Sequence, residues 1–380
     1  MLYNKLGRTG VDVSKVGLGC EHMVGMPQAD VSAIIGRALD AGVNYMDIFM
    51  SQSEVRDRIG CAVKGRRDKV MLQGMLGSIT VDDACTKTTD PVSSMFYYED
   101  FLKRMHTDYA DTCMLFFVDE QKDFDAVFGP GGNAEAALKL KEQGKCRFIG
   151  MSCHNPLIAL QAVKTGLLDV LMFPVNPAHD TRPGTENIDQ LFDHQRIIEA
   201  GSVGVHPDRA LLYETCAALG TAIVVMKTYA AGWLLGEDAP TGLRMTPEQL
   251  IHYALSQPGV ASALPGCRSV AEMDAALKYL DATDAQRDFS FIANTSMFDT
   301  TGKCMYCNHC LPCPSNIDVA AVMRLLDAAK REGVTPGLRE AYGKLQSNAS
   351  DCIECGGCEA LCPFHVPVIE RMKKTVEVFA

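Results

Sequence analysis

The chain has 380 residues, of which 47% are hydrophobic, and a formal net charge of −11. This acidic charge makes nucleic acid or an anionic membrane a poor partner, and no apolar run reaches the ~18 residues that a membrane-spanning helix needs. The first residues, Met1 to Lys5, do not begin a signal-peptide core, so we expect a cytoplasmic protein.

Short β-rich runs alternate with helical patterns over roughly the first 280 residues, which indicates parallel βαβ units. The eight predicted strands are Val13–Gly19, Val43–Asp47, Lys69–Gly74, Thr112–Val118, Arg147–Met151, Val170–Val175, Ala222–Met226 and Ala261–Pro265. The predicted helices between them include Asp30–Ala41, Glu54–Lys64, Ala134–Gln143 and Pro247–Ser256. This order predicts an α/β fold, a (β/α)8 TIM barrel with its active site at the carboxyl ends of the strands. A doubly wound sheet is the alternative, which the lack of a G-x-G-x-x-G motif at the first helix disfavours.

Sixteen cysteines are unevenly distributed, with eight of them in two runs near the end of the chain. The first run is Cys304, Cys307, Cys310 and Cys313, and the second is Cys352, Cys355, Cys358 and Cys362. In a reducing cytosol such runs indicate metal sites rather than disulfides. Three cysteines at two-residue gaps, then a fourth before proline, follow the bacterial two-cluster pattern, in which the fourth cysteine binds the other cluster.

The pattern therefore predicts two [4Fe–4S] clusters with exchanged ligands. One would be held by Cys304, Cys307, Cys310 and Cys362, and the other by Cys352, Cys355, Cys358 and Cys313. The first run is one residue short before its last cysteine, and zinc or a disulfide knot are the alternatives. Helices are expected at Ile317–Arg331 and Leu338–Leu345. We expect a barrel over residues 1–285 and an α-helical ferredoxin-like domain over residues 286–380.

Over essentially its whole length, the chain resembles an aldo-keto reductase with a C-terminal ferredoxin-like module. The matching stretches are Asn4–Gly19, Ala38–Asp47, Ala62–Val70, Asp108–Leu115, Ile149–Pro156, Ile223–Lys227, Gln257–Met273 and Asp351–Pro363. The resemblance implies a TIM barrel that binds NADP(H) at its top. It also implies carbonyl reduction by a tetrad of aspartate, tyrosine, lysine and histidine.

Most of that tetrad is absent from this chain. Asp47 matches the aspartate, but the segment Ile48–Glu54 contains no tyrosine. Met75 and Phe116 occupy the lysine and histidine positions, and neither side chain transfers protons. Standard aldo-keto reductase chemistry is therefore not expected.

The expected nicotinamide pocket is altered as well. The segment Met172–Asn176 lacks the glutamine and tyrosine that the family places there. The matching residues that remain are Ser152 and the loop with Gly266, Arg268 and Ser269, where a glycine turn, a helix start and an arginine suit a phosphate. A helix cap with a surface arginine explains the loop equally well, so NADP(H) stays an open alternative.

Four polar residues are candidate catalytic groups: Asp47, His22, Cys20 and His154. A carboxyl group buried without a cation has a raised pKa and can serve as a general acid or base. Cys20 and His22 could form a nucleophile and its base, part of a metal site, or ordinary core and loop residues. Other polar groups expected at the barrel mouth are Glu21, Asn155, Glu120, His179 and Lys227.

These features favour an iron–sulfur oxidoreductase in which electrons reach a small-molecule substrate, or a further cofactor, through the clusters. A ferredoxin or flavodoxin is the expected redox partner, and an anaerobic source is expected because exposed clusters are oxygen-labile. Three alternatives remain: an NADP(H)-dependent carbonyl reductase with structural clusters; a non-redox lyase, isomerase or hydrolase; and a catalytically dead electron-transfer or binding subunit.

Overall fold

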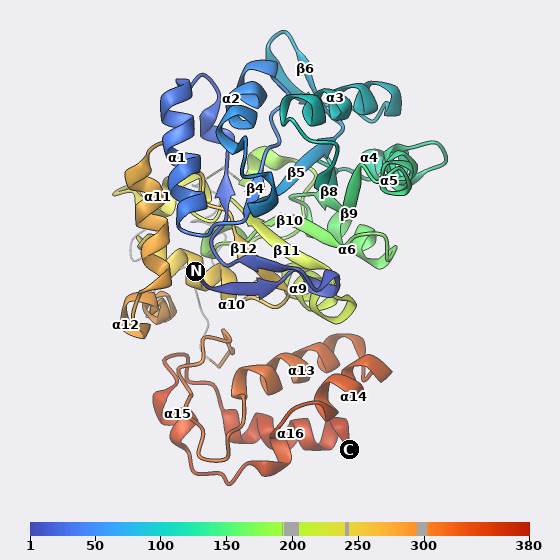
Figure 1. The fold of residues 1–380 in the computed structure, drawn as a ribbon. Coiled ribbons are helices and arrows are strands. Elements are labelled where there is room, and N and C mark those ends of the chain that lie inside the picture. The colour runs from blue at the N-terminus through green and yellow to red at the C-terminus, as the bar shows by residue number, and fades with distance from the viewer. Residues whose placement is uncertain (192, 194–204, 240–242, 295–301) are drawn as a thin grey trace.

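The computed structural model describes residues 1–191, 193, 205–239, 243–294 and 302–380. Among these, no helix has the length and apolar character needed to cross a bilayer. Two bodies are visible, a barrel and a helical module beneath it (Figure 1).

Eight parallel strands form the barrel and confirm the predicted (β/α)8 architecture. They are β3 (Leu18–Gly19), β4 (Tyr45–Asp47), β5 (Met71–Leu76), β8 (Ala110–Leu115), β9 (Cys146–Ser152), β10 (Val170–Pro174), β11 (Ala222–Met226) and β12 (Val260–Ala263). Neighbouring strands are hydrogen-bonded in that order. Parallel bridges from Val16 to Ala263 and from Gly19 to Gly266 bring the two edges of the sheet together.

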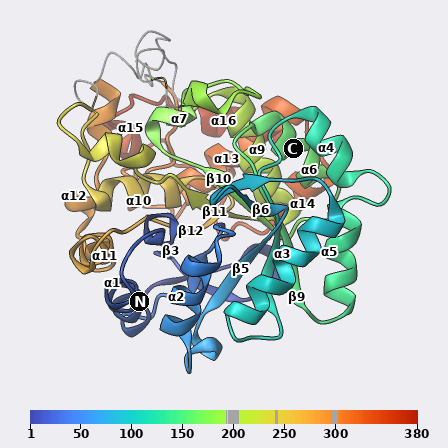
Figure 2. The same ribbon diagram turned by 90° about the horizontal axis from the view of Figure 1, so that it is seen from above.

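Helices surround the strands, as Figure 2 shows from above. The longer ones are α1 (Gln28–Asp40), α2 (Ser53–Val63), α3 (Pro91–Arg104), α4 (Gln121–Phe128), α5 (Asn133–Glu142), α6 (Pro156–Lys164), α9 (Pro207–Leu219), α10 (Pro247–Ser256) and α11 (Val270–Leu277). The short ones are α7 (Pro177–Asp180) and α12 (Asp284–Arg287), with 3-10 turns η1 (Gly7–Thr9), η2 (Glu21–Met23), η3 (Arg67–Lys69), η4 (Ile188–Leu191), η5 (Ala230–Leu235), η6 (Lys278–Leu280) and η7 (Ser290–Asn294). Local sequence signals determine where several helices begin. For example, α10 begins at Pro247, after the N-cap residue Thr246, which forms a capping box with Gln249.

The first predicted strand, Val13–Gly19, proves to be two separate strands. Its beginning is β2 (Asp12–Ser14), which pairs antiparallel with β1 (Tyr3–Lys5), and only β3 belongs to the barrel. Gly17 lies between β2 and β3, where a Cβ atom would come within 2.2 Å of the Leu264 side chain. The hairpin covers the end of the barrel opposite the strand carboxyl ends, because Leu6 and Val13 pack with inward-facing residues such as Val170 and Val224.

A second hairpin, β6 (Ser78–Val81) with β7 (Ala84–Lys87), was not predicted. Its two-residue turn consists of Asp82 and Asp83, which both have positive φ angles of 48° and 61°. Aspartate tolerates this left-handed conformation better than most residues, and two such residues in sequence suit a type I′ hairpin turn. The hairpin extends the chain after β5, next to the carboxyl ends of the strands.

The C-terminal module contains α13 (Val319–Glu332), α14 (Pro336–Gly343), α15 (Gly357–Leu361) and α16 (Val368–Phe379), with η8 (Ala349–Asp351). The predicted helices at 317–331 and 338–345 correspond to α13 and α14. The module lies against the α9 and α10 side of the barrel (Figure 1), where Arg324 donates to the Ser256 carbonyl oxygen at 3.1 Å. The predicted boundary between residues 285 and 286 falls inside α12.

Candidate functional site

A cavity of about 440 Å³ opens at the carboxyl ends of the barrel strands. Its lining comes from the ends of the strands and the loops that follow them: Gly19, Glu21, His22, Asp47, Phe49, Met75, Phe116, Phe117, Ser152, His154, Met172, Ile188, Met226, Lys227, Ala231, Leu264 and Arg268. Three of the four predicted catalytic residues, Asp47, His22 and His154, therefore share one cavity.

Asp47 ends β4 and lies at the buried side of this cavity, with only 5% of its surface exposed. Gln73 Nε2 donates to Asp47 Oδ1 at 2.7 Å, and Tyr45 Oη donates to Gln73 Oε1 at 2.8 Å. Burial, together with the negative charge of Glu21, raises the pKa of Asp47 to about 7, although Gln73 and Lys227 oppose the rise. Near neutral pH this carboxyl group can therefore either give or accept a proton.

Apolar side chains fill the positions where the family resemblance implies lysine and histidine. Met75 lies within β5 and Phe116 directly follows β8, and both line the cavity. The Phe116 ring stacks on Phe49 with 6.2 Å between centroids and an interplanar angle of 11°. Met172 and Met226 extend the same lining. A flat, apolar molecule suits such walls.

His154 and Lys227 form a polar chain at the edge of the cavity. The His154 backbone N–H donates to Asp119 Oδ1 at 2.7 Å, and ring atom Nδ1 lies 2.9 Å from Asp119 Oδ2. Asp119 therefore keeps the proton on Nδ1, which leaves Nε2 as an acceptor 3.1 Å from Lys227 Nζ. Burial and the charge of Lys227 lower the pKa of His154 to about 4, so the ring is neutral at physiological pH.

His22 and Cys20 follow β3 but lie in different environments. His22 lines the cavity, and its Nε2 is 3.8 Å from Glu21 Oε1. Cys20 is fully buried in the hydrophobic core and is not among the cavity-lining residues. Burial, reinforced by the charge of Asp47, raises the pKa of its thiol well above the usual range. The structure thus does not bring Cys20 and His22 together as a nucleophile and its base.

The predicted cofactor residues divide between the cavity and a neighbouring loop. Ser152 lines the cavity and its Oγ accepts from the Phe117 N–H at 2.8 Å. Arg268 lines both the cavity and an adjacent hollow that also contains Gly266. Ser269 caps α11 by accepting from the Glu272 N–H at 3.2 Å.

Two carboxylates occupy the positions around this loop that a phosphate would need. Glu272 Oε2 accepts from the Arg268 N–H at 2.7 Å. Glu21 lies across Gly266, so that a Cβ atom at that glycine would come within 2.1 Å of Glu21 Oε1. A phosphate would have to displace both carboxylates or tolerate their repulsion. The residues present therefore do not fit the phosphate end of NADP(H).

Cysteines from both runs of the C-terminal module line one hollow. This hollow between α13 and α16 is lined by Cys313 together with Cys352, Cys355 and Cys358, and by Cys310. Its other walls are apolar: Ile317, Val319, Ile353, Val368, Ile369 and Met372. The fourth cysteine of the first run thus stands with the first three cysteines of the second run, as a cross-ligated cluster requires.

The other three cysteines of the module, Cys304, Cys307 and Cys362, are close enough to Cys310 or to one another to act electrostatically. Burial raises the pKa of Cys304 and Cys310 to about 12, with the Cys307 thiol adding to the effect at each. Burial likewise raises the pKa of Cys307, to which Cys362 contributes. Within the described residues, no three His, Cys, Asp or Glu side chains converge on a single metal ion. In a [4Fe–4S] cluster each cysteine binds a different iron, so three ligands need not converge on one ion, and eight thiols would supply the donors for two such clusters.

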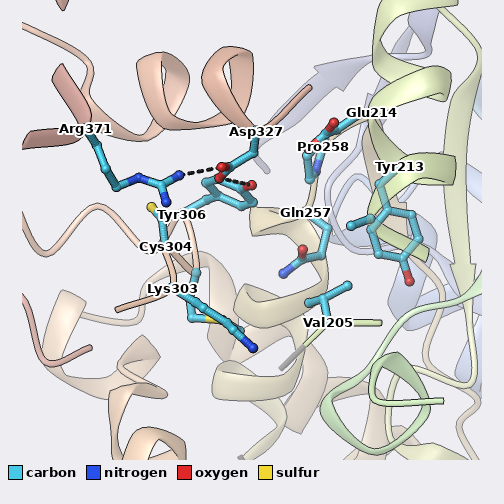
Figure 3. Close-up of a pocket in the computed structure, with 12 residues that line it drawn as sticks. Val205, Tyr213, Glu214, Gln257, Pro258, Lys303, Cys304, Tyr306, Asp327 and Arg371 are labelled. Carbon is cyan, nitrogen blue, oxygen red and sulfur yellow. Dashed lines mark hydrogen bonds and ion pairs between the residues drawn. The ribbon is translucent and has the colours of Figure 1, made fainter. Parts of the chain in front are cut away.

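The first cysteine run adjoins the barrel at a cleft of about 200 Å³ (Figure 3). Asp327 of α13 pairs with Arg371 of α16 and accepts from Tyr306 Oη at 3.2 Å. Cys304 lies beside this group, and Tyr213 of α9 lines the barrel side of the cleft. A cluster held by Cys304 would therefore lie next to the barrel wall.

Asp119 and Gln73, which hold His154 and Asp47 in place, were not among the predicted site residues. Asp119 directly follows the predicted strand Thr112–Val118, so its position at a strand end was a usable signal. Gln73 is a polar residue within the buried strand β5, where an amide needs a partner. Of the other expected mouth residues, Asn155 caps α6 and Glu120 pairs with Lys87 and Lys122.

Comparisons with known proteins agree with the barrel. The sequence matches no protein-family model. It is 26% identical over 284 residues to the uncharacterized oxidoreductase YqkF of Bacillus subtilis. The aligned stretch covers 72% of this chain and 89% of that protein. An aldo-keto reductase from Bacillus halodurans, in its holo form, superposes with a TM-score of 0.58 and 22% identity over 76% of this chain and 94% of its own. The chain thus has the barrel fold of the aldo-keto reductases.

Proposed function

We propose that this chain is an oxidoreductase related to the aldo-keto reductases, in which electrons reach a small-molecule substrate through two [4Fe–4S] clusters. The observation that carries the proposal is a contrast between two sites. The barrel cavity has Met75 and Phe116 where a hydride-transferring site needs proton-transfer groups, whereas the C-terminal module gathers eight cysteines, five of which line one hollow. This contrast supports electron delivery through clusters over hydride transfer.

The two cysteine sets have defined roles in this proposal. Cys304, Cys307, Cys310 and Cys362 hold the cluster nearer the barrel, and Cys352, Cys355, Cys358 and Cys313 hold the other. When bound, such clusters supply electrons one at a time. A small electron-carrier protein of the ferredoxin or flavodoxin class is the proposed donor.

The chain's own residues bind and protonate the substrate. Asp47 gives or accepts a proton at the buried side of the cavity, because its pKa lies near 7. His22 and His154 border the same space. Cys20 helps to hold the backbone of Asp47 in place, since its N–H donates to the Asp47 carbonyl oxygen at 3.2 Å.

Anaerobic single-turnover spectroscopy tests this function. Dithionite should bleach the visible absorbance of the purified protein, and a substrate found by screening small aldehydes, ketones and quinones should restore it with product formed in proportion. The Asp47→Asn variant should still be bleached by dithionite but should be reoxidised by that substrate much more slowly. Turnover that proceeds at the same rate whatever the redox state of the clusters would contradict the proposal.

A further inference from the structure

Gln73 is fully buried within β5 and lies beside Asp47 inside the barrel. In the parallel pair of β4 and β5, Asp47 is directly opposite Gln73, and side chains at matched positions point to the same face of a sheet. We propose that Gln73 is a positioning residue that places the transferable proton of Asp47 on Oδ2, the carboxyl oxygen left for the substrate. This inference rests on the proposed function, because the position of the proton matters to the substrate only if Asp47 is its acid.

Three contacts fix the orientation of the Gln73 amide. Gln73 Oε1 accepts from Tyr45 Oη at 2.8 Å. Gln73 Nε2 donates to Asp47 Oδ1 at 2.7 Å and to Met172 Sδ at 3.5 Å. A primary amide has two N–H donors, and both are used here. An amide turned end for end would set Oε1 against the methionine sulfur and an ionised carboxyl oxygen, so the observed orientation is the favourable one.

Tyr45 holds the other end of this amide. It is fully buried in β4, two residues before Asp47, and its side chain therefore points to the same face of the sheet. Burial, with a contribution from the charge of Asp47, raises the pKa of the Tyr45 hydroxyl well above its usual range. Tyr45 thus keeps its hydrogen at physiological pH, and Gln73 Oε1 keeps its donor.

The carboxyl group of Asp47 consequently has two unlike oxygens. Oδ1 accepts the N–H of Gln73, so a hydrogen on that oxygen would point at another hydrogen. Within the part of the chain that the structure describes, the Asp47 carboxyl group has no other hydrogen bond, and the residue is 5% exposed in the cavity wall. The proton of neutral Asp47 therefore belongs on Oδ2, where a bound substrate can accept it.

A neutral donor holds a carboxyl group in place without removing its proton. A lysine or arginine at the same distance would stabilise the carboxylate by ion pairing and lower its pKa strongly. Gln73 also lowers the pKa of Asp47, but burial and the charge of Glu21 outweigh it and bring the value to about 7. Asp47 thus has the two properties that an acid catalyst needs, a fixed orientation and a proton near neutral pH.

Titratable groups from several loops also act on Asp47. Glu21, after β3, raises its pKa and Lys227, after β11, lowers it. The Cys20 thiol and the Tyr45 hydroxyl lie close enough for their own pKa values to respond to its charge. The other charged or titratable residues of the cavity wall are His22, His154 and Arg268. Among the described residues, none of these groups hydrogen-bonds to the Asp47 side chain, so they change its proton affinity without fixing its orientation.

The proton has a defined path in each reductive step. For every electron that the substrate takes from a reduced cluster, the Oδ2–H bond of Asp47 breaks and that proton forms a bond to the substrate. Water in the cavity then reprotonates the carboxylate, and the electron-carrier protein reduces the cluster again. Gln73 and Tyr45 exchange no proton in this scheme, because their contacts are the same before and after the transfer.

Infrared difference spectroscopy tests the role of Gln73 without substrate or turnover. Anaerobic, oxidised holoprotein is titrated between about pH 5.5 and about pH 9, and the carboxyl C=O band that is missing from Asp47→Asn is assigned to Asp47. In Gln73→Met, which has a similar length but no donor, we expect this band at a higher frequency because Oδ1 has lost its N–H. The proton affinity of Asp47 should also rise at least about tenfold, because a hydrogen bond stabilises an ionised acceptor by about that much.

Two further variants make the test specific. Tyr45→Phe frees the amide to turn and accept the carboxyl hydrogen, so it should also shift the band and raise the proton affinity of Asp47; it covers the case in which Gln73→Met does not fold. Gln257→Met removes another buried amide, which lies outside the cavity and donates to the Tyr253 carbonyl oxygen at 3.4 Å, and should behave as wild type.

Two results would overturn the proposal. One is a band and a proton affinity that stay at their wild-type values in Gln73→Met, or in Tyr45→Phe where that variant alone folds. The other is an effect of the same size in Gln257→Met. Cluster reoxidation by substrate is measured separately, so the position of the proton is decided whether or not the electron-transfer function stands.

Discussion

Replacing Asp47 with asparagine should stabilise the folded chain at neutral pH. The folded-state pKa of Asp47 is about 7, against about 3.9 in an unfolded chain. At 1.36 kcal/mol for each pKa unit, this gap corresponds to about 4 kcal/mol of instability at and above pH 7. Asparagine Oδ1 can still accept from Gln73 Nε2, which now lies 2.7 Å from Asp47 Oδ1, so the gain is not cancelled by a lost hydrogen bond.

The stability gained by the Asp47→Asn substitution should increase with pH. An acid whose pKa is raised by folding favours the folded state below its unfolded pKa, and that contribution is lost as the pH rises through the folded value. The stability difference between Asp47→Asn and wild type should therefore be near zero at pH 4, grow between pH 4 and pH 7, and stay constant above pH 7.

Far-UV circular dichroism with urea, at several pH values under anaerobic conditions, measures this difference. Visible absorbance should be followed in parallel, so that loss of the clusters is not mistaken for unfolding of the barrel. Asp281→Asn removes the same charge from an exposed position after η6 and should show no such trend. A destabilising Asp47→Asn substitution, or a stabilisation that is the same at pH 4 and pH 8, would refute the reasoning about this carboxyl group.

Three further predictions concern the clusters, the nucleotide and the core. Cys313→Ser should disturb the cluster of the second cysteine run and Cys362→Ser that of the first, so electron paramagnetic resonance of the two variants should lose different signals; identical losses would contradict cross-ligation. NADPH should cause no saturable quenching of Trp233 fluorescence, since two carboxylates crowd the phosphate loop. Asp180→Asn should destabilise the barrel by about 3–5 kcal/mol in urea titrations, because it leaves the fully buried Arg209, 3.6 Å away, without its counter-ion; a change below 1 kcal/mol would be inconsistent with that ion pair.

The barrel could be predicted from the sequence because its strands are buried on both faces and read as continuous apolar runs. The hairpin of β6 and β7 was missed for a different reason. Its strands are mostly half-buried or exposed and do not form an apolar run. Its turn uses Asp82 and Asp83 in place of the glycine that usually marks such a turn. Likewise, the run Val13–Gly19 shows no break, although its two halves pair with different partners.

A site residue could be predicted from the sequence where its position at the end of one strand was sufficient evidence. Asp47 was identified because a carboxyl group at the end of a barrel strand faces the mouth. The chain from Asp119 through His154 to Lys227 joins residues 35 and 73 positions apart, and its geometry depends on how three loops meet above the barrel. Sequence spacing contains no information of that kind, so Lys227 could be listed as a mouth residue but given no role.

Burial shifts the pKa values of two charged groups in the cavity, Asp47 and Lys227. A tyrosine in the usual tetrad donates its proton because a neighbouring lysine lowers its pKa. Here burial moves the pKa values of two other groups toward each other, since it raises that of Asp47 and lowers that of Lys227. Each group is thereby brought closer to the pH range in which it can exchange a proton. The instability that Asp47 imposes on the fold is thus the physical cost of keeping a protonatable carboxyl group in an apolar cavity.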